Sequence, residues 1–315
     1  MTELLTSRSR ILTRQRCARA RYWMDEAFGT GFSPVKVAIP LATGGAVHAG
    51  LKTLMLQALD IPGMLDIEDA VEDAVLEFKS ECENRQLDLD ALESQSFVYA
   101  EQLALTEALV RLAGTRVIPR LLELYEVLEV ERLDTAPLVQ DDDVHDTRDA
   151  FSVLFRSIPD ALVRSRADGD LYVISWKTTS EYSASRDQDA RTDMQGLSEA
   201  WALEKRLARW QDRLTEARDI VHPIERHNVE DYDGETLDEI PAWFREHVAN
   251  GGTSAIRGVQ MIYLVKGPRR KNPDGTYATQ SPLIKGLRRS DPTGLSAPEF
   301  ATERYYTCTE PHPFK

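Results

Sequence analysis

The sequence predicts an α/β or α+β domain in which one mixed sheet is flanked by helices. Three observations favour that class. Helical periodicity without a strand pattern fills the region before about residue 123. From Tyr125 onward apolar and charged residues alternate, which is typical of a half-buried strand. The later sequence is consistent with an antiparallel meander, a long helix and a further strand, and that order fits a sheet flanked by helices.

The N-terminal part is expected to be helical throughout. An apolar stripe among arginines predicts a helix over residues 3–26, and a Gly/Pro-rich connector follows at 29–34. The stretch that begins at Ile39 is expected to be a glycine-containing loop that opens into a helix ending near residue 59. Two more helices are predicted, at about 66–84 and 97–123.

The middle of the chain is expected to form the meander. The expected strands lie at about 125–133, 150–156, 158–165 and 170–177. Asp168-Gly169 is predicted to be the turn of the last hairpin. Residues 140–146 include three adjacent aspartates. We interpret them as a flexible solvated loop, because consecutive residues do not converge on one cation without a specific turn.

The C-terminal half is expected to return to helix and strand. The expected elements are helices at about 190–217 and 236–249 and strands at 256–265 and 277–287. No internal repeat is visible, so we expect residues 1–315 to form a single domain. We divide it into a mostly helical part (1–123), a core (124–290) and a C-terminal tail (291–315).

Composition and charge restrict the class of protein. The chain is 42% hydrophobic and 29% charged, which is ordinary for a soluble globular protein. No apolar run is long enough to span a membrane, and the N-terminus lacks the apolar core of a signal peptide. Cys17, Cys82 and Cys308 are odd in number and far apart, which argues against a disulfide framework. We therefore expect a cytoplasmic protein without a membrane partner.

The most informative stretch is the hairpin that carries Asp160 and Lys177 on adjacent strands. Residues two apart on a strand share a face, so Ser175 and Lys177 point one way while Ile174 and Trp176 point to the opposite layer. Asp160 stands beside them if the register allows. A carboxylate can bind Mg²⁺ or Mn²⁺, and a lysine there can orient a water or stabilise charge on a phosphate. A salt-bridged surface hairpin accounts for the spacing equally well.

Two further segments add candidate site residues. His48 follows the glycines of Thr43–His48 and is expected in the first turn of a helix. Gln195 and Glu199 are four residues apart and share one face of the next long helix. Taken alone, His48 fits a packed or surface residue, and the helix fits an ordinary amphipathic one.

In this order, the residues resemble the PD-(D/E)XK nuclease superfamily, in particular its RecB-type branch of phage exonucleases and recombination nucleases. That branch has a helical Gly…His motif, an Asp after a short strand, a (D/E)-X-Lys strand and a Gln motif on the next helix. The matching segments are Gly44 to His48, Pro159-Asp160, Ser175-Trp176-Lys177 and Gln195. The segment from Cys17 to Trp23 is similar to the branch's N-terminal Cys and aromatic motif. The resemblance extends from about residue 8 to 290.

The resemblance implies a restriction-endonuclease-like core behind a helical N-terminal region. It also implies Mg²⁺- or Mn²⁺-dependent hydrolysis of DNA, as by an exonuclease in phage or mobile-element recombination, with a recombination protein as a candidate partner. His48 and Asp160 would be metal ligands, Lys177 would position the nucleophile, and Gln195 would hold the DNA or the site together. A net charge of −14 is unusual for a protein that contacts phosphates. The positive charge is instead concentrated in a basic hairpin, which would guide the DNA strand. Its basic residues are Lys266, Arg269, Arg270, Lys271, Lys285 and Arg288.

Ser175 departs from the family pattern, because it stands where the second metal-binding acid is expected. Some restriction enzymes of the superfamily have Ser-X-Lys and take the acid from the following helix. Glu199 and Asp193 are the candidates on that helix, and Glu199 is preferred because it shares a face with Gln195. Glu131 is a third candidate. The alternative is a nuclease-fold protein without catalysis that binds DNA or a partner nuclease.

An iron–sulfur cluster is not expected in this chain. Some family members hold such a cluster with one N-terminal and three C-terminal cysteines. Cys17 and Cys308 are the corresponding residues here, and they fall short of the four thiolates that a cluster needs.

Overall fold

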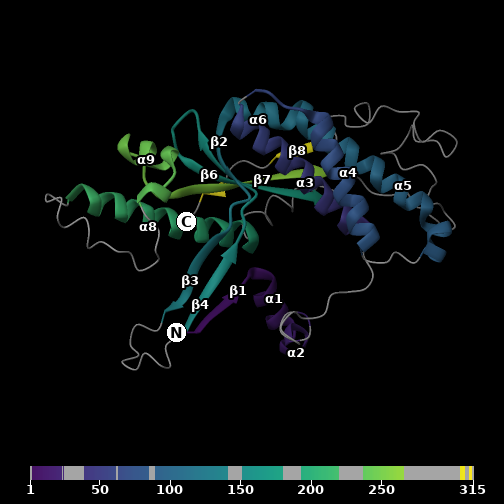
Figure 1. Ribbon diagram of the computed structural model, residues 1–315, viewed down its shortest axis with the longest axis horizontal. Helices are drawn as coiled ribbons and strands as arrows, with labels where there is room; N and C mark the ends of the chain where they lie inside the picture. Colours follow the sequence, from purple (N-terminus) through teal and green to yellow (C-terminus); the bar gives the residue numbers. More distant parts are fainter. Residues whose placement is uncertain are drawn as a thin grey trace.

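The computed structural model describes residues 2–22, 24, 39–61, 63–84, 89–140, 151–179, 193–219, 237–265, 306–308 and 312–313. The strands are β1 (Thr2–Thr6), β2 (Tyr125–Val130), β3 (Asp134–Gln140), β4 (Phe151–Ser157), β5 (Ala161–Ser165), β6 (Leu171–Thr179), β7 (Ile256–Val265), β8 (Tyr306–Cys308) and β9 (His312–Pro313) (Figure 1). The helices are α1 (Arg8–Arg16), α2 (Ala18–Arg21), α3 (Ile39–Asp60), α4 (Ile67–Asn84), α5 (Leu89–Leu112), α6 (Ile118–Leu124), α8 (Met194–Asp219) and α9 (Ala242–Ala249). A π-helical turn, Ala113–Val117, joins α5 to α6.

The larger of the two described sheets is mixed. Its strand order is β2-β5-β6-β7-β8, and β9 also pairs with β7. β2, β5 and β6 are antiparallel neighbours, whereas β6 and β7 run parallel. The turn between β5 and β6 is closed by the Gly169 N–H, which donates to the Ser165 carbonyl at 2.9 Å. The predicted fold class and the predicted hairpin are both confirmed.

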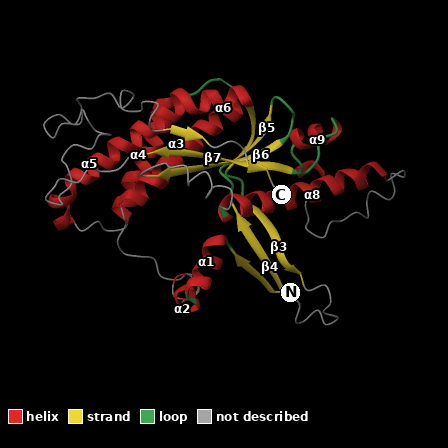
Figure 2. Cartoon of the chain, turned by 180° about the vertical axis from the view of Figure 1, so that it is seen from behind, coloured by secondary structure: helices red, strands yellow, loops and turns green. Residues whose placement is uncertain are grey.

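Helices cover both faces of this sheet (Figures 1 and 2). Helices α3, α4 and α6 pack on one face, and α8 and α9 pack on the other. Ile174 and Trp176 of β6 lie in the first core, while Leu171 and Val173 lie in the second. Alternation along the strand therefore directs position 177 toward the α8 side; that it lies opposite Ile174 and Trp176 is as the sequence predicts.

A smaller sheet joins the N-terminus to α8. Its strand order is β1-β4-β3, with β1 parallel to β4. A small core of Ala136, Phe155 and Ala202 connects it to α8, and Ile11 of α1 and Trp201 pack against that core. Figure 2 shows this sheet and α1 beside α8, away from α3, α4 and α5.

The N-terminal region differs from the single helix predicted over residues 3–26. Thr2–Thr6 is a strand that pairs with β4, and the helical residues after it are divided at Cys17. Ser7 (φ −144°) and Cys17 (φ −163°) are both extended and end the helical geometry on either side of α1. Periodicity within the segment cannot reveal a strand partner so distant in sequence.

The meander also differs from the prediction. Residues 151–157 belong to the smaller sheet rather than to the mixed sheet, and their partner β3 was not predicted. Pro137 argues against a strand in the sequence, because proline is tolerated in sheets only at edges and bulges. β3 meets both conditions: it is an edge strand, and it has a bulge between Pro137 and Val139. The strand predicted over 125–133 ends at Val130, since Glu131 has φ +44°.

Gly44 and Gly45 lie inside α3, so the predicted glycine loop is wrong and His48 lies well beyond the first turn. A Cβ at Gly44 would stand 3.1 Å from the Thr178 hydroxyl oxygen. The glycine therefore allows α3 to approach the end of β6 closely, which brings His48 to the sheet.

Several predictions fall outside the described residues. These are the connector 29–34, the loop 141–146, the strand 277–287 and all six residues of the basic hairpin. The division of the chain into three parts stays a prediction. In the described part of the chain, no helix is long and apolar enough to cross a membrane.

Candidate active site

Asp160 lies immediately before β5 and is held from two sides. Its Oδ2 accepts a hydrogen bond from the Trp176 backbone N–H of β6 at 2.7 Å. Its Oδ1 lies 3.2 Å from Nδ1 of His48 on α3. Both side chains are mostly buried, with 14% of Asp160 and 30% of His48 exposed. One carboxylate oxygen is thus fixed to the strand that carries Lys177, and the other faces the imidazole of His48.

Lys177 and Gln195 meet on the α8 side of the sheet. The Lys177 Nζ donates to Gln195 Oε1 in the first turn of α8. Arg8 Nη1 of α1 donates to the same oxygen at 3.3 Å. The Gln195 backbone N–H donates to Asp193 Oδ1 at 2.8 Å, so Asp193 caps the helix N-terminus. Two cations from separate elements therefore converge on one amide oxygen.

Glycine again positions the helix. A Cβ at Gly196 would stand 2.9 Å from Cγ1 of Val259 on β7. Any side chain there would push the first turn of α8 away from the sheet, and Gln195 would move with it. Close packing of this turn explains how a helix residue reaches the lysine of a strand.

Glu199 is a buried acid beside this group. It is 5% exposed, and its Oε2 has no hydrogen-bond partner among the described residues. Burial raises its pKa from 4.5 to about 7; the Asp160 carboxylate adds to the rise, while the Gln195 hydrogen bond and the Lys177 charge oppose it. Glu199 therefore lies within electrostatic range of both Asp160 and Lys177.

Ser175 is fully buried, and its hydroxyl lacks a hydrogen-bond partner among the described residues. The other two candidate acids are engaged elsewhere. Asp193 caps α8 and pairs with Arg8 at 3.6 Å, and Glu131 pairs with Lys52 at 2.8 Å. Of the three acids weighed against Ser175, Glu199 is the one with a buried oxygen that no described group satisfies.

A comparison with protein families bears on this arrangement. The sequence model of the PD-(D/E)XK nuclease superfamily matches residues 6–261, which is most of the chain and runs from before α1 into β7. The chain belongs to the PD-(D/E)XK nuclease superfamily. The match does not distinguish the RecB-type branch from others. No curated protein matches the chain closely enough to count as a relative.

PD-(D/E)XK nucleases generally use divalent metals. Within the described ranges, no group of three or more His, Cys, Asp or Glu side chains is arranged to hold a metal ion. The side chains nevertheless offer the oxygen ligands that a hard cation prefers. The carboxylates of Asp160 and Glu199 lie within electrostatic range of each other, and Glu199 has a buried oxygen without a hydrogen-bond partner among the described residues. A cation shared by Asp160 and Glu199 would satisfy that oxygen.

One residue that contacts this cluster was not predicted from the sequence. Arg8 stands among several arginines of an N-terminal segment predicted as a single helix, and nothing in that pattern separates it from Arg10 or Arg14. Its contact with Gln195 depends on the smaller sheet, which was not predicted. The sequence therefore carried no usable signal for it.

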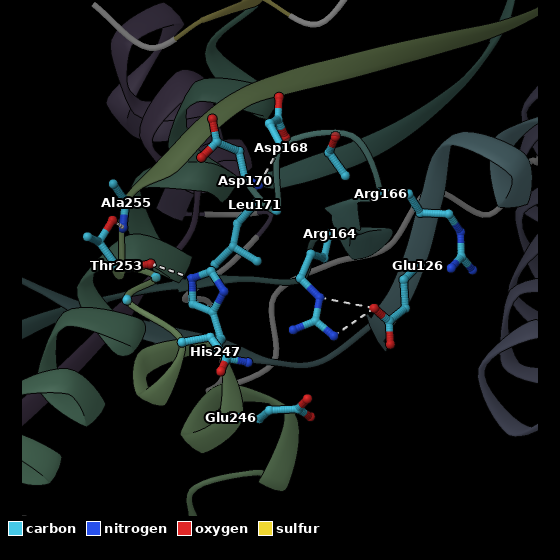
Figure 3. Close-up of a pocket in the computed structure, with 15 residues that line it drawn as sticks. Glu126, Arg164, Arg166, Asp168, Asp170, Leu171, Glu246, His247, Thr253 and Ala255 are labelled. Carbon is cyan, nitrogen blue, oxygen red and sulfur yellow. Dashed lines mark hydrogen bonds and ion pairs between the residues drawn. The ribbon is translucent and has the colours of Figure 1, made fainter.

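A separate polar pocket lies at the other end of the β5–β6 hairpin (Figure 3). It has a volume of about 580 Å³ and lies between that hairpin's turn and the end of α9. Arg164 points into it while bonded to Glu126, and His247 bonds the Thr253 carbonyl at 3.0 Å. None of the predicted site residues lines this pocket, so it is distinct from the Asp160–Lys177 site.

Proposed function

We propose that this nuclease-superfamily protein is a Mg²⁺- or Mn²⁺-dependent deoxyribonuclease of RecB type, acting as an exonuclease in phage or mobile-element DNA recombination or processing. The single observation that carries the proposal is Glu199: a buried carboxylate with an unsatisfied oxygen, close to Asp160 and Lys177. It supplies the acid that Ser175 lacks. The superfamily supports a nucleic-acid substrate. The choice of DNA and the exonuclease mode are proposed from the sequence resemblance.

Each residue has a role that its contacts support. Asp160 and Glu199 would hold the cation, with His48 fixing the orientation of Asp160 or joining as a ligand. When bound, the cation polarises a phosphate oxygen and lowers the pKa of a water. Lys177 would orient the attacking water and stabilise charge on the phosphate. Gln195 would hold the Lys177 ammonium in place through its amide oxygen.

The raised pKa of Glu199 has a consequence for this scheme. A carboxyl group with a pKa of about 7 is partly protonated at neutral pH in the absence of a cation. Binding of a divalent cation favours the ionised form and releases the proton. Metal affinity is therefore expected to rise with pH through neutrality.

The test uses purified protein with linear and circular DNA in Mg²⁺ or Mn²⁺. Wild type is expected to degrade linear DNA and leave the closed circle intact. Lys177→Ala is expected to lower the rate by about 100-fold or more. Lys205→Ala is the matched control, because Lys205 is an exposed lysine on α8. Degradation of both DNA forms would indicate an endonuclease rather than an exonuclease. Equal rates for wild type and Lys177→Ala would show that Lys177 is not part of the active site.

A second candidate function is a nuclease-fold protein without catalysis that binds DNA or a partner nuclease. The observation that favours it is Ser175, which is buried with an unsatisfied hydroxyl at the position of the usual acid. Under this alternative wild type degrades neither DNA form in any metal, and a gel shift of linear DNA persists in both Lys177→Ala and Glu199→Gln.

A further inference from the structure

Arg8 contacts the proposed site although it does not belong to the elements of the mixed sheet. It lies at the start of α1, which follows β1, and β1 pairs with β4 of the smaller sheet. Ile11, three residues later, packs against the core that joins that sheet to α8. Residues three apart share a helix face, so packing of Ile11 directs Arg8 toward the beginning of α8.

The Arg8 guanidinium contacts the beginning of α8 at two points. Its Nη1 donates to Gln195 Oε1 at 3.3 Å, and its Nη2 lies 3.6 Å from Asp193 Oδ1. The same Asp193 oxygen accepts the Gln195 backbone N–H. The planar Arg8 guanidinium, whose donors have a fixed geometry, thus contacts both the Gln195 side chain and Asp193, the residue that caps the helix at the Gln195 backbone N–H.

Gln195 needs such support because its amide has two possible orientations. Exchange of its oxygen and nitrogen would turn an NH₂ group toward the Lys177 ammonium, which has no acceptor. A second cation on the same oxygen disfavours that exchange, since both Lys177 and Arg8 then require the oxygen. The contact also keeps the lysine's acceptor in place while the lysine acts.

We propose that Arg8 is a positioning residue of the nuclease site, which acts through Gln195 to hold Lys177 in its working orientation. The inference rests on the proposed function. Its contribution to folding is expected to be small, because 38% of the Arg8 side chain is exposed and exposed ion pairs stabilise little. The N-terminal β1–α1 segment is therefore a functional part of the site rather than only a structural addition.

The test is a double-mutant cycle on metal-dependent cleavage of linear DNA by the full chain. Arg8→Ala is expected to lower kcat by roughly 10- to 100-fold with KM nearly unchanged. In the Gln195→Ala background the same change is expected to have almost no further effect, because the route runs through Gln195. Arg8→Lys is expected to recover part of the loss. Arg14→Ala removes an exposed charge of the same helix and serves as control.

Each outcome bears on one of the two proposals. Arg8→Ala with wild-type kcat, or a full loss from Arg8→Ala in the Gln195→Ala background, overturns the positioning role. A raised KM that grows with salt concentration indicates direct contact with DNA phosphates and also overturns it. A drop in kcat that matches a large fall in Tm points to misfolding and overturns it as well. Wild type that cleaves no DNA overturns the proposed function, and with it any role of Arg8 in cleavage.

Discussion

The burial of Glu199 leads to a prediction about folding stability that does not depend on DNA. Its folded-state pKa of about 7 lies above the ordinary value of 4.5. The folded state therefore binds the proton more tightly between those two values, and its stability falls as pH rises through that window. One pKa unit corresponds to about 1.4 kcal/mol, so the ionised carboxylate costs the folded state about 3 kcal/mol above pH 7. Glu199→Gln removes that cost.

The assay is urea unfolding of the metal-free protein in EDTA. Glu199→Gln is expected to be more stable than wild type by about 3 kcal/mol at pH 8, and by less than about 1 kcal/mol at pH 5. Glu216→Gln, at an exposed position of the same helix, is the matched control and is expected to show no such pH-dependent gain. If the gain of Glu199→Gln over wild type is no larger at pH 8 than at pH 5, Glu199 is not a desolvated acid.

Two further predictions concern the elements around the site. Gly45→Ala is expected to raise stability by about 0.5–1 kcal/mol, because Gly45 is helical and an added Cβ meets nothing within 4 Å; Gly44→Ala is expected to give no gain, since its Cβ would crowd the Thr178 hydroxyl. A higher Tm for Gly44→Ala than for Gly45→Ala would contradict the close approach of α3. Arg206→Met is expected to cost about 3–5 kcal/mol in urea unfolding, because Arg206 pairs with the buried acids Glu129 and Asp134. Arg132 also pairs with Glu129, at 3.1 Å, so a loss below about 1 kcal/mol would show that the two acids do not depend on Arg206.

The parts of the fold that were predicted correctly are those encoded locally. The alternation of apolar and polar residues and the Asp168-Gly169 turn predict the β5–β6 hairpin, and a long amphipathic pattern predicts α8. The face shared by Ser175 and Lys177 followed from strand periodicity alone. The preference for Glu199 over Asp193 rests on helix spacing and stays a prediction; the structure buries Glu199 within electrostatic range of Asp160.

The parts that were missed depend on contacts between distant segments. β1 is a strand because β4 lies beside it, and β3 contains a proline that disguises it. The glycines before His48 were interpreted as a loop, but Gly44 serves a close helix–strand approach, and sequence alone does not separate those uses. Arg8 was missed for the same reason, since its place at Gln195 follows from the smaller sheet. Local pattern thus predicted the strand and helix that carry the site, and tertiary pairing decided what else joins it.

Glu199 is proposed to replace the acid missing at Ser175. The most direct measurement compares Mg²⁺- or Mn²⁺-dependent cleavage of linear DNA by Glu199→Gln and by the double variant Ser175→Asp, Glu199→Gln. Glu199→Gln is expected to lower the rate by about 100-fold or more, and adding Ser175→Asp is expected to restore a measurable part of it. Glu131→Gln, whose acid pairs with Lys52, is expected to keep wild-type activity. Wild-type cleavage by Glu199→Gln, or loss of cleavage in Glu131→Gln instead, would show that Glu199 does not replace the missing acid.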